Sequence, residues 1–347
     1  MAPRDRDARL RSLFIVKLCE PLSLKVTAEN SIRSRHMHVL GIDAGGTKTV
    51  CLLADDRARV VAVARASGAN LQAGGEHEVE KVLHHVMEAA LGDRGVRPEA
   101  VCLGIAGADR EDDARVVRAI MRRISPGSRV LVVNDALVAL VAGAGREAAI
   151  VVMAGTGSIA YGRNAHGFAA RAGGWGHAIG DEGSGYWIGR RALAAVVREV
   201  DGRGPRTRLT ADVLAHFDVP DAAALVSVVY DRKLPRHGVA TLGPVVQAAH
   251  AAGDAVATHI LERAAEELTL AGRSVASRLD MRGETFVFLL AGGVFQAVPS
   301  LAGQMERRLV EVAPRCRVSL LAEEPAAGAV ALALDEARGG AQVPRYL

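Results

Sequence analysis

The segments 38–54, HVLGIDAGGTKTVCLLA, and 148–161, AAIVVMAGTGSIAY, follow the same plan. In each, an apolar run leads into a Gly-Thr turn and a second apolar run leaves it, which is typical of two strands joined by a tight hairpin. A third strand is expected after each pair, at 60–64 and at 168–171. Two such three-strand openings in one chain indicate an internal duplication, so we expect two domains of related topology.

Strands and helices alternate along the rest of the chain, and this alternation predicts an α/β protein. Apolar residues recur at helical spacing over 76–91 and over 254–279, where Asp254 is the expected N-cap. The glycines at 143–147 indicate a domain boundary, and the tail 338–347 is expected to be loose. Further helices are expected over 112–124, from 135, and over 182–200, 239–251 and 326–337, and further strands over 100–106, 130–133, 286–290 and 318–321.

Composition excludes several classes of protein. Half of the 347 residues are apolar, enough for a sizeable core, and no apolar run reaches the length of about 18 residues that a membrane span needs. The four cysteines are far apart and form no CxxC pair, as in a cytoplasmic protein with reduced thiols. The net charge of +4 lies in residues 1–37, so no basic face for a nucleic acid is expected elsewhere. We interpret 1–37 as a disordered or mistranslated leader.

The first glycine-rich turn is the run Asp43-Ala44-Gly45-Gly46-Thr47. Its glycines can bring backbone N–H groups close to an anion, and the Thr47 hydroxyl can reach a phosphate oxygen. Asp43 could hold Mg²⁺ through water, since this ion keeps several waters and takes few carboxylates. The run lacks the ending of a Walker loop, and by itself it could equally be a plain hairpin.

The second turn, Gly155-Thr156-Gly157-Ser158, imitates the GxGxxA fingerprint of dinucleotide-binding proteins. That fingerprint requires a helix to follow, whereas residues 159–161 predict a strand. A second phosphate-binding hairpin, with Thr156 as its hydroxyl donor, therefore fits better.

Two other positions follow predicted strands. Asp135 comes after the apolar run 130–133, and the carboxyl ends of such strands are where α/β proteins bind ligands. It could act as a general base toward a sugar hydroxyl, or it could be the N-cap of the next helix. Gly292 and Gly293 follow a later strand, where small residues would let adenine lie against the backbone. A plain turn between strand and helix is the alternative for these glycines.

Residues 173–187, GGWGHAIGDEGSGYW, hold six glycines and both tryptophans of the chain. So much glycine in an ordered segment is easier to explain if a ligand must approach the backbone closely. Asp181 could accept hydrogen bonds from sugar hydroxyls, and the backbone of 174–176 could contribute others. Trp187 is expected in the core, which argues against the alternative of a flexible surface loop.

Taken in order, these motifs resemble those of the N-acetylglucosamine kinase and BadF/BadG/BcrA/BcrD ATPase family, within the sugar kinase, Hsp70 and actin superfamily. The specific part is the run 173–184, and the resemblance covers about residues 38–338. It implies an actin-like ATPase fold, in which two related ribonuclease-H-like domains enclose a nucleotide cleft. The expected domains are 38–146, joined by a returning helix at 326–338, and 147–325.

The resemblance implies an ATP- and Mg²⁺-dependent kinase that phosphorylates an amino sugar, foremost N-acetylglucosamine, at its 6-hydroxyl. It implies no nucleic-acid or membrane partner and leaves a homodimer open. Ile159 replaces the Asn that animal N-acetylglucosamine kinases carry after the loop serine, so glucosamine and N-acetylmuramic acid also stay open. Asp135 would be the catalytic base, and Asp43 would hold the metal. The implied nucleotide contacts are Gly45, Gly46, Thr47, Gly155, Thr156, Gly157, Gly292 and Gly293, and the implied sugar contacts are Asn70, Asp135, Ser158, Gly174, Trp175, Gly176 and Asp181.

Two other activities compete with the kinase. ATP-driven activators of radical dehydratases or reductases resemble the chain in both phosphate loops. They hold an iron–sulfur cluster with cysteines near the start of the second half, but here no cysteine lies between Cys102 and Cys316. Sugar-sensing regulators of the related ROK group add a DNA-binding helix-turn-helix and a cysteine zinc motif. The leader is too short for that domain and the motif is absent, so the kinase remains the prediction.

Overall fold

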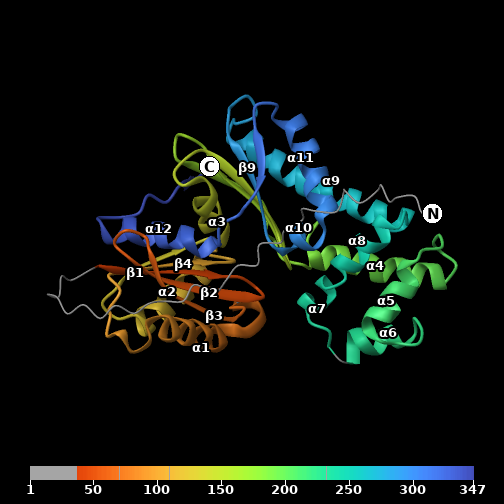
Figure 1. The fold of residues 1–347 in the computed structure, drawn as a ribbon, viewed down its shortest axis with the longest axis horizontal. Coiled ribbons are helices and arrows are strands. Elements are labelled where there is room, and N and C mark those ends of the chain that lie inside the picture. Colours follow the sequence, from red (N-terminus) through yellow and green to blue (C-terminus); the bar gives the residue numbers. More distant parts are fainter. Residues whose placement is uncertain (1–36, 70, 109, 232) are drawn as a thin grey trace, which may run out of the picture. The chain divides into compact units, whose positions relative to one another are not determined.

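The computed structural model describes residues 37–347, apart from positions 70, 109 and 232. The interpretation of the leader 1–37 falls almost entirely outside the described residues. Figure 1 shows the fold as a ribbon, in which two groups of strands are each covered by helices.

The two β-sheets repeat one topology. The first has the strand order β3-β2-β1-β4-β5 and the second the order β10-β9-β6-β7-β8-β11. In the first, β1 is antiparallel to β2 and parallel to β4, and in the second, β6 is antiparallel to β7 and parallel to β9. This repetition confirms the duplication expected from the two hairpins. The strands are β1 His38–Ala44, β2 Lys48–Asp55, β3 Val60–Ser67, β4 Ala100–Ile105, β5 Arg129–Val133, β6 Ala149–Ala154, β7 Ser158–Arg163, β8 Phe168–Gly173, β9 Val287–Ala291, β10 Arg317–Leu320 and β11 Arg345–Tyr346.

The predicted helices are present with some changed ends. The helix predicted from 182 begins only at Gly185, because the side chain of Ser184 accepts a hydrogen bond from the Trp187 N–H and caps it. The helix predicted over 239–251 is broken in two, because a proline in the first turn of the second part starts a new helix rather than continuing one. The helices are α1 Leu71–Leu91, α2 Glu111–Ile124, α3 Asp135–Ala144, α4 Gly185–Val200, α5 Leu209–Phe217, α6 Ala224–Val226, α7 Arg236–Ala240, α8 Gly243–Ala251, α9 Ala255–Arg278, α10 Gly293–Ala297, α11 Pro299–Val312 and α12 Pro325–Ala337, with a 3₁₀ turn at Gly92–Arg94 and a π turn at Ser227–Asp231.

Two features differ from the expectation. Helix α5 was not predicted, because its nine residues bury only Leu209 and Val213, too short an apolar pattern to detect. The prediction of a loose tail at 338–347 was wrong, since β11 pairs with β8 and the ring of Tyr346 lies edge-on to Tyr161 at 6.0 Å. An edge strand offers unpaired backbone groups, and here the chain's own end uses those of β8.

The hydrophobic core that α3 and α12 share contains residues from both sheets. Alternate residues of β1 point to opposite faces, so Leu40 and Ile42 pack toward α1 and α2 while Val39 packs toward α3 and α12. The shared core also takes in Val151 of β6 and Leu289 of β9. Helix α3 therefore packs against both sheets, while α12 packs against α3 and the first sheet, and α3 begins at Asp135, a predicted site residue.

The crossing of α12 and α3 has room only for glycine at one point. A Cβ at Gly328 of α12 would overlap the carbonyl oxygen of Val138 in α3, and that oxygen is backbone and cannot turn aside. The absence of a side chain at Gly328 therefore lets α12 and α3 pack closely in the shared core.

We predict that Gly328→Ala lowers the free energy of unfolding by about 3 kcal/mol or more, the upper part of the range for an overpacked core. Urea unfolding followed by circular dichroism measures this. Gly283→Ala is the matched control, since a Cβ there would meet no heavy atom within 4 Å. Equal stability of the two variants would contradict the tight crossing.

Candidate nucleotide and sugar site

The two Gly-Thr turns, one from each sheet, touch each other. The hydroxyl oxygens of Thr47 and Thr156 are 2.8 Å apart, although 109 positions separate them in the chain. The first turn joins β1 to β2 and the second joins β6 to β7, so both are hairpins, as the sequence indicated. Two hydroxyl-bearing glycine turns thus meet at one point of the fold.

A neighbouring segment supports the first turn. The Ala69 N–H donates to the carbonyl of Gly45 at 3.1 Å, and a Cβ at Gly68 would overlap the backbone of Gly46. The residues after β3 therefore pack against the first Gly-Thr turn, which is a candidate for binding phosphate. The next residue, Asn70, is a predicted sugar contact and lies outside the described residues, so its role stays a prediction.

Two carboxylates lie beside the first turn. Asp43 is 7% exposed at the end of β1, and burial, together with the negative charge of Asp135, raises the pKa of Asp43 to about 7. Glu324 raises this pKa further, and the positive charge of Lys48 opposes the rise. The site therefore concentrates negative charge in a partly dry place, which is a setting that attracts a cation.

Asp135 is the half-buried first residue of α3, and it is not the helix cap. The side chain of Asn134 accepts the Ala136 N–H at 2.8 Å and is the N-cap. The carboxylate of Asp135 accepts the same N–H at 3.0 Å. The alternative reading of Asp135 as an N-cap was therefore wrong, because its neighbour fills that position.

An ion-pair group that the sequence analysis missed adjoins the two carboxylates. Lys48 Nζ lies 2.8 Å from Glu324 Oε1, and Arg65 Nη2 lies 3.2 Å from Glu324 Oε2. Glu324 immediately precedes α12, so the pairs connect the β2 and β3 strands to the start of that helix. Lys48 follows Thr47 directly, but nothing in the sequence shows that its partner lies 276 positions away.

The carboxylates fit Mg²⁺ held largely by water. Among the described positions, no group of three or more His, Cys, Asp or Glu side chains could form a metal cage. Mg²⁺ is usually bound by one or two carboxylates, several waters and the phosphates of a nucleotide. Asp43, with its raised pKa, and Asp135 beside it supply what such an ion needs from the protein.

The glycine-rich segment that follows β8 places a buried carboxylate against the second turn. Asp181 is 6% exposed and accepts a hydrogen bond from the Ser158 N–H at 3.4 Å. Burial raises the pKa of Asp181, while that N–H and the charges of Arg236 and His177 oppose the rise. The Ser158 hydroxyl donates a hydrogen bond to the Glu182 carbonyl at 2.7 Å. This hydrogen bond holds the glycine-rich segment against the second turn.

The backbone of the segment depends on glycine where it turns. Gly174 and Gly176 have φ values of 71° and 88°, a region that residues with a side chain rarely adopt. Between them Trp175 is 58% exposed, with the Arg171 guanidinium 4.6 Å from its ring. Trp187, by contrast, is 6% exposed, which confirms its predicted place in the core.

The late glycines also lie at the second turn. A Cβ at Gly292 would overlap the carbonyl of Ala154, and the φ of Gly292 is 103°. The Gly185 N–H donates to the carbonyl of Gly155 at 2.8 Å, so the start of α4 reaches the same turn. Gly293 has nothing within 4 Å of the position its Cβ would take. The structure thus gathers three separate glycine motifs around β6.

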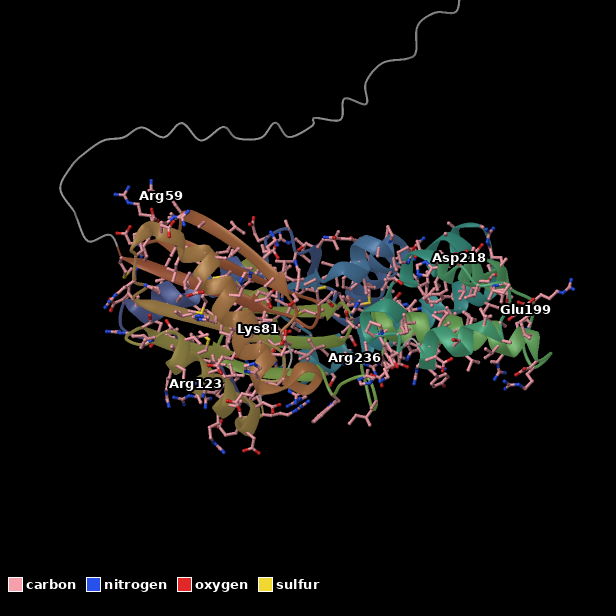
Figure 2. All side chains as sticks on the ribbon, turned by 90° about the horizontal axis from the view of Figure 1, so that it is seen from below. Arg59, Lys81, Arg123, Glu199, Asp218 and Arg236 are labelled. Carbon is pink, nitrogen blue, oxygen red and sulfur yellow. The ribbon has the colours of Figure 1, made fainter. Side chains whose placement is uncertain are left out.

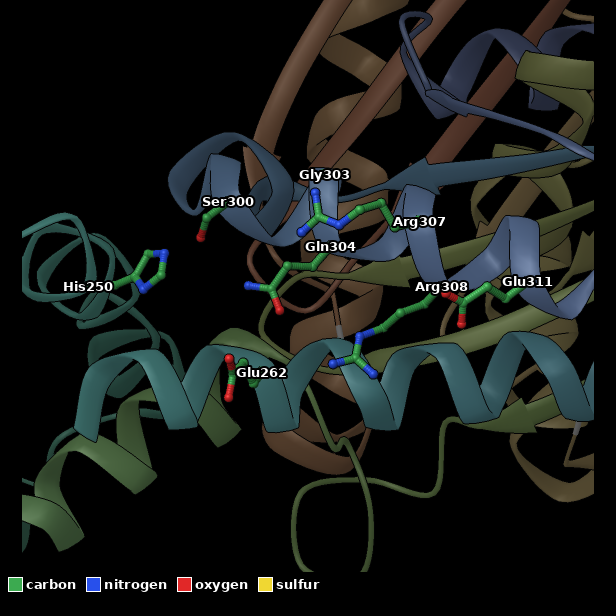
Figure 3. Close-up of a pocket in the computed structure, with 8 residues that line it drawn as sticks. All are labelled: His250, Glu262, Ser300, Gly303, Gln304, Arg307, Arg308 and Glu311. Atoms are coloured by element: carbon green, nitrogen blue, oxygen red, sulfur yellow. The ribbon is translucent and has the colours of Figure 1, made fainter. Parts of the chain in front are cut away.

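A hollow of about 610 Å³ lies between α8, α9 and α11, and Figure 3 shows its side chains. It contains none of the residues predicted from the sequence, and its charges are mixed. The residues that line it are His250, Glu262, Ser300, Gly303, Gln304, Arg307, Arg308 and Glu311.

Comparison with known proteins assigns the family. The model of the BadF/BadG/BcrA/BcrD ATPase family matches residues 40–333. The N-acetylmuramic acid/N-acetylglucosamine kinase of Clostridium acetobutylicum is 36% identical, over 86% of this chain and 99% of its own. This chain belongs to the BadF/BadG/BcrA/BcrD ATPase family. The N-acetyl-D-glucosamine kinase of Dictyostelium discoideum is 31% identical, over 85% of this chain and 97% of that protein.

The family fold is confirmed as well. A provisionally assigned N-acetylglucosamine kinase of Chromobacterium violaceum superimposes with a TM-score of 0.71 at 28% identity, over 86% of this chain and 99% of that structure. Together with the repeated sheets, this shows the α/β actin-like ATPase fold that the resemblance implied. The ends of the two domains stay predictions. In the described part of this family member, no helix is long and apolar enough to cross a membrane.

The raised pKa of Asp43 predicts that ionisation of this carboxyl lowers the stability of the folded protein as the pH rises. Asp43 titrates near 3.8 when unfolded and at about 7 when folded, so the folded state binds the extra proton between these values. Stability therefore falls as pH rises from about 4 to 7 and then stays low. Asp43→Asn removes the titration and should stabilise the protein above pH 7 by at most about 4 kcal/mol, with little effect near pH 4.

The measurement is urea unfolding at pH 4 to 8 without nucleotide or Mg²⁺. Asp112→Asn is the matched control, because that side chain is 90% exposed. A stabilisation of Asp43→Asn that is the same at every pH would show that the carboxylate carries no such cost.

Proposed function

We propose that this chain transfers the γ-phosphate of ATP to the 6-hydroxyl of an amino sugar. The observation that carries the proposal is the 2.8 Å contact between the Thr47 and Thr156 hydroxyls, with Asp43 and Asp135 beside it. Two glycine turns from two related sheets then cradle the phosphates. The relatives named as N-acetylmuramic acid/N-acetylglucosamine kinase and N-acetyl-D-glucosamine kinase support an amino sugar as the acceptor.

The turns bind the phosphates through groups that need no proton transfer. The Thr47 and Thr156 hydroxyls, which bond to each other in the structure, would turn to phosphate oxygens as the sheets move slightly apart. The backbone of Gly45, Gly46, Gly155 and Gly157 would add N–H groups. Gly293, which has nothing within 4 Å of its Cβ position, would leave space for the adenine ring, and Gly292 would hold this stretch against Ala154 at the second turn.

Asp135 serves as the general base. In the transfer, the sugar O6 forms a bond to the γ-phosphorus as the bond from that phosphorus to the β,γ-bridging oxygen breaks, and ADP leaves. The carboxylate of Asp135 accepts the proton of the 6-hydroxyl. Its place at the start of α3, fixed by the Asn134 cap, holds this oxygen in position.

Asp43 would hold Mg²⁺ through water. Such an ion would supply positive charge to offset that of the phosphates. Asp43 is suited to this role because burial and Asp135 make its ionised form costly without a cation.

Asp181 and the glycine-rich segment bind the sugar. The buried carboxylate can accept hydrogen bonds from two sugar hydroxyls, with Ser158, Gly174, Trp175 and Gly176 around it. Ile159, which replaces the family Asn, lies under the segment, because a Cβ at Gly174 would be only 2.9 Å from its Cδ1 atom. The apolar Ile159 side chain thus packs against the segment at a position where the Asn would make a polar contact.

We predict that Asp135→Asn lowers kcat by about 10²- to 10⁴-fold, because the base is lost while the shape is kept. ADP release with N-acetylglucosamine measures this, and a melting curve checks the fold. Asp112→Asn, also in the first turn of a helix, is the control and should keep full activity. Turnover that survives in Asp135→Asn would remove Asp135 from the proposed role.

The position of transfer and the metal have a separate test. We expect ³¹P–¹H correlation to place the phosphate on C6, and 6-deoxy-N-acetylglucosamine to inhibit without being phosphorylated. Activity should vanish with EDTA and return with Mg²⁺, since the phosphates need a cation to approach the two carboxylates. A product phosphorylated at C1, or turnover in EDTA, would contradict these details.

A further inference from the structure

The ion pair of Lys48 with Glu324 lies beside the carboxylate proposed to hold the metal. Asp43 of β1 is directly opposite Val50 of β2, and Lys48 is two positions before Val50. Side chains two positions apart on a strand share a face, so Lys48 and Asp43 are diagonal neighbours across the hairpin. That face is the one that α12 covers, because Val50 belongs to the core that α3 and α12 share. The pair therefore stands where the first Gly-Thr turn leaves the sheet.

The two members of the pair act on Asp43 in opposite directions. Burial and the charge of Asp135 raise the pKa of Asp43 most, Lys48 lowers this pKa, and Glu324 raises it. A charge shifts a pKa in this way from a short distance. Lys48 and Glu324 are thus part of the same electrostatic site as the two carboxylates.

Glu324 divides its two oxygens between two cations. Lys48 Nζ donates to Oε1 at 2.8 Å, whereas both Nη atoms of Arg65 donate to Oε2, at 3.3 and 3.2 Å. If Lys48 left this group, Glu324 would still be paired with Arg65. Lys48 can leave more readily than Arg65, because an ammonium on a flexible stem is less constrained than a planar guanidinium that donates twice.

The pair is exposed enough to open at little cost. The side chains of Lys48, Arg65 and Glu324 are 60, 58 and 28% exposed, and ion pairs in contact with water contribute little to stability. Lys48 directly follows Thr47, whose hydroxyl is proposed to bind a phosphate oxygen. A lysine ammonium binds phosphate as a point charge. Phosphates at the first turn would therefore compete with Glu324 for Lys48.

We propose that Glu324 competes with the phosphates of the nucleotide for Lys48, and that this competition sets the affinity for ATP and ADP. The inference rests on the proposed function, because it requires phosphates at the first turn. Without nucleotide, Lys48 pairs with Glu324. With nucleotide, Lys48 contacts a phosphate oxygen and Glu324 keeps Arg65. Glu324 is then a positioning residue, which touches no substrate and acts through Lys48.

Two other roles for the pair predict different results. If the pair only holds the start of α12 against β2, loss of either member changes binding in the same direction. If Glu324 acts only by repelling the phosphates, its loss tightens binding whether or not Lys48 is present. Competition for Lys48 predicts instead that the two losses have opposite effects, and that the effect of Glu324 disappears without Lys48.

The experiment measures the binding of ADP with Mg²⁺ to the full chain by calorimetry, with no sugar present. Lys48→Met should raise Kd about 10- to 100-fold, as expected for a lost hydrogen bond to a charged group. Glu324→Gln should lower Kd about two- to fivefold, the effect of an exposed ion pair. The double variant should match Lys48→Met alone. Adenosine, measured by displacement of ADP, should bind wild type and variants within about twofold, because it carries no phosphate.

Two controls change charged side chains that lie over the other face of the first sheet, and Figure 2 labels both. Lys81→Met removes an exposed lysine of α1, and Arg123→Gln breaks the ion pairs that join α2 to Glu76 and Glu80 of α1. Neither change should alter the Kd of ADP. Melting curves check that every variant folds, and Lys48→Gln repeats the test if Lys48→Met melts early.

Each other outcome is decisive. Changes in the same direction for Lys48→Met and Glu324→Gln would assign the pair a bracing role and overturn the proposal. Tighter binding by the double variant than by Lys48→Met would overturn it too, because Glu324 would then act on the phosphates directly. Normal turnover of N-acetylglucosamine with a Kd of ADP that Lys48→Met leaves unchanged would remove this inference alone.

Failure of the proposed function looks different. A wild-type protein that binds ADP, responds to the variants as expected and phosphorylates no amino sugar would count against the proposed function while the role of Glu324 stands. A wild-type protein that binds no ADP would overturn both.

Discussion

The core shared by α3 and α12 is the constraint on which the site depends. It joins residues of both sheets, and it closes where Gly328 lets α12 approach the backbone of Val138. Each sheet ends its first strand in a Gly-Thr turn, and only a fixed relation between the sheets brings the two turns together. The 2.8 Å contact of Thr47 with Thr156 is the result. The catalytic candidate Asp135 starts one of the two helices of this core.

The same arrangement places negative charges close together, which is electrostatically unfavourable. Asp43 is buried beside Asp135 and near Glu324, and the pKa of Asp43 rises to about 7 for that reason. Lys48 and Arg65 offset part of this charge by pairing with Glu324. A site that gathers carboxylates in this way favours binding of a cation. Phosphates would then bind together with that cation, because its positive charge offsets theirs. Carboxylates with perturbed pKa values cluster at functional sites.

The segment proposed to bind the sugar is built differently. Asp181 is buried, and the backbone near it turns at Gly174 and Gly176 with φ values that favour glycine, whereas Trp175 and Ile179 of the same segment are exposed. Substitutions at the exposed side chains would therefore leave the backbone of this segment intact.

The sequence by itself determined the α/β class, the duplicated hairpins and most of the helices, because these depend on local periodicity and turn chemistry. It also indicated Asp135 and Asp181 as candidate site residues, since each stands beside a recognisable motif. It could not show that Asn134, not Asp135, caps α3, because both residue types favour that position. Only the tertiary structure decided that Thr47 meets Thr156, that Lys48 pairs with Glu324, and that Arg236 faces His177. Those contacts join positions 109, 276 and 59 residues apart, and packing, not local pattern, places them together.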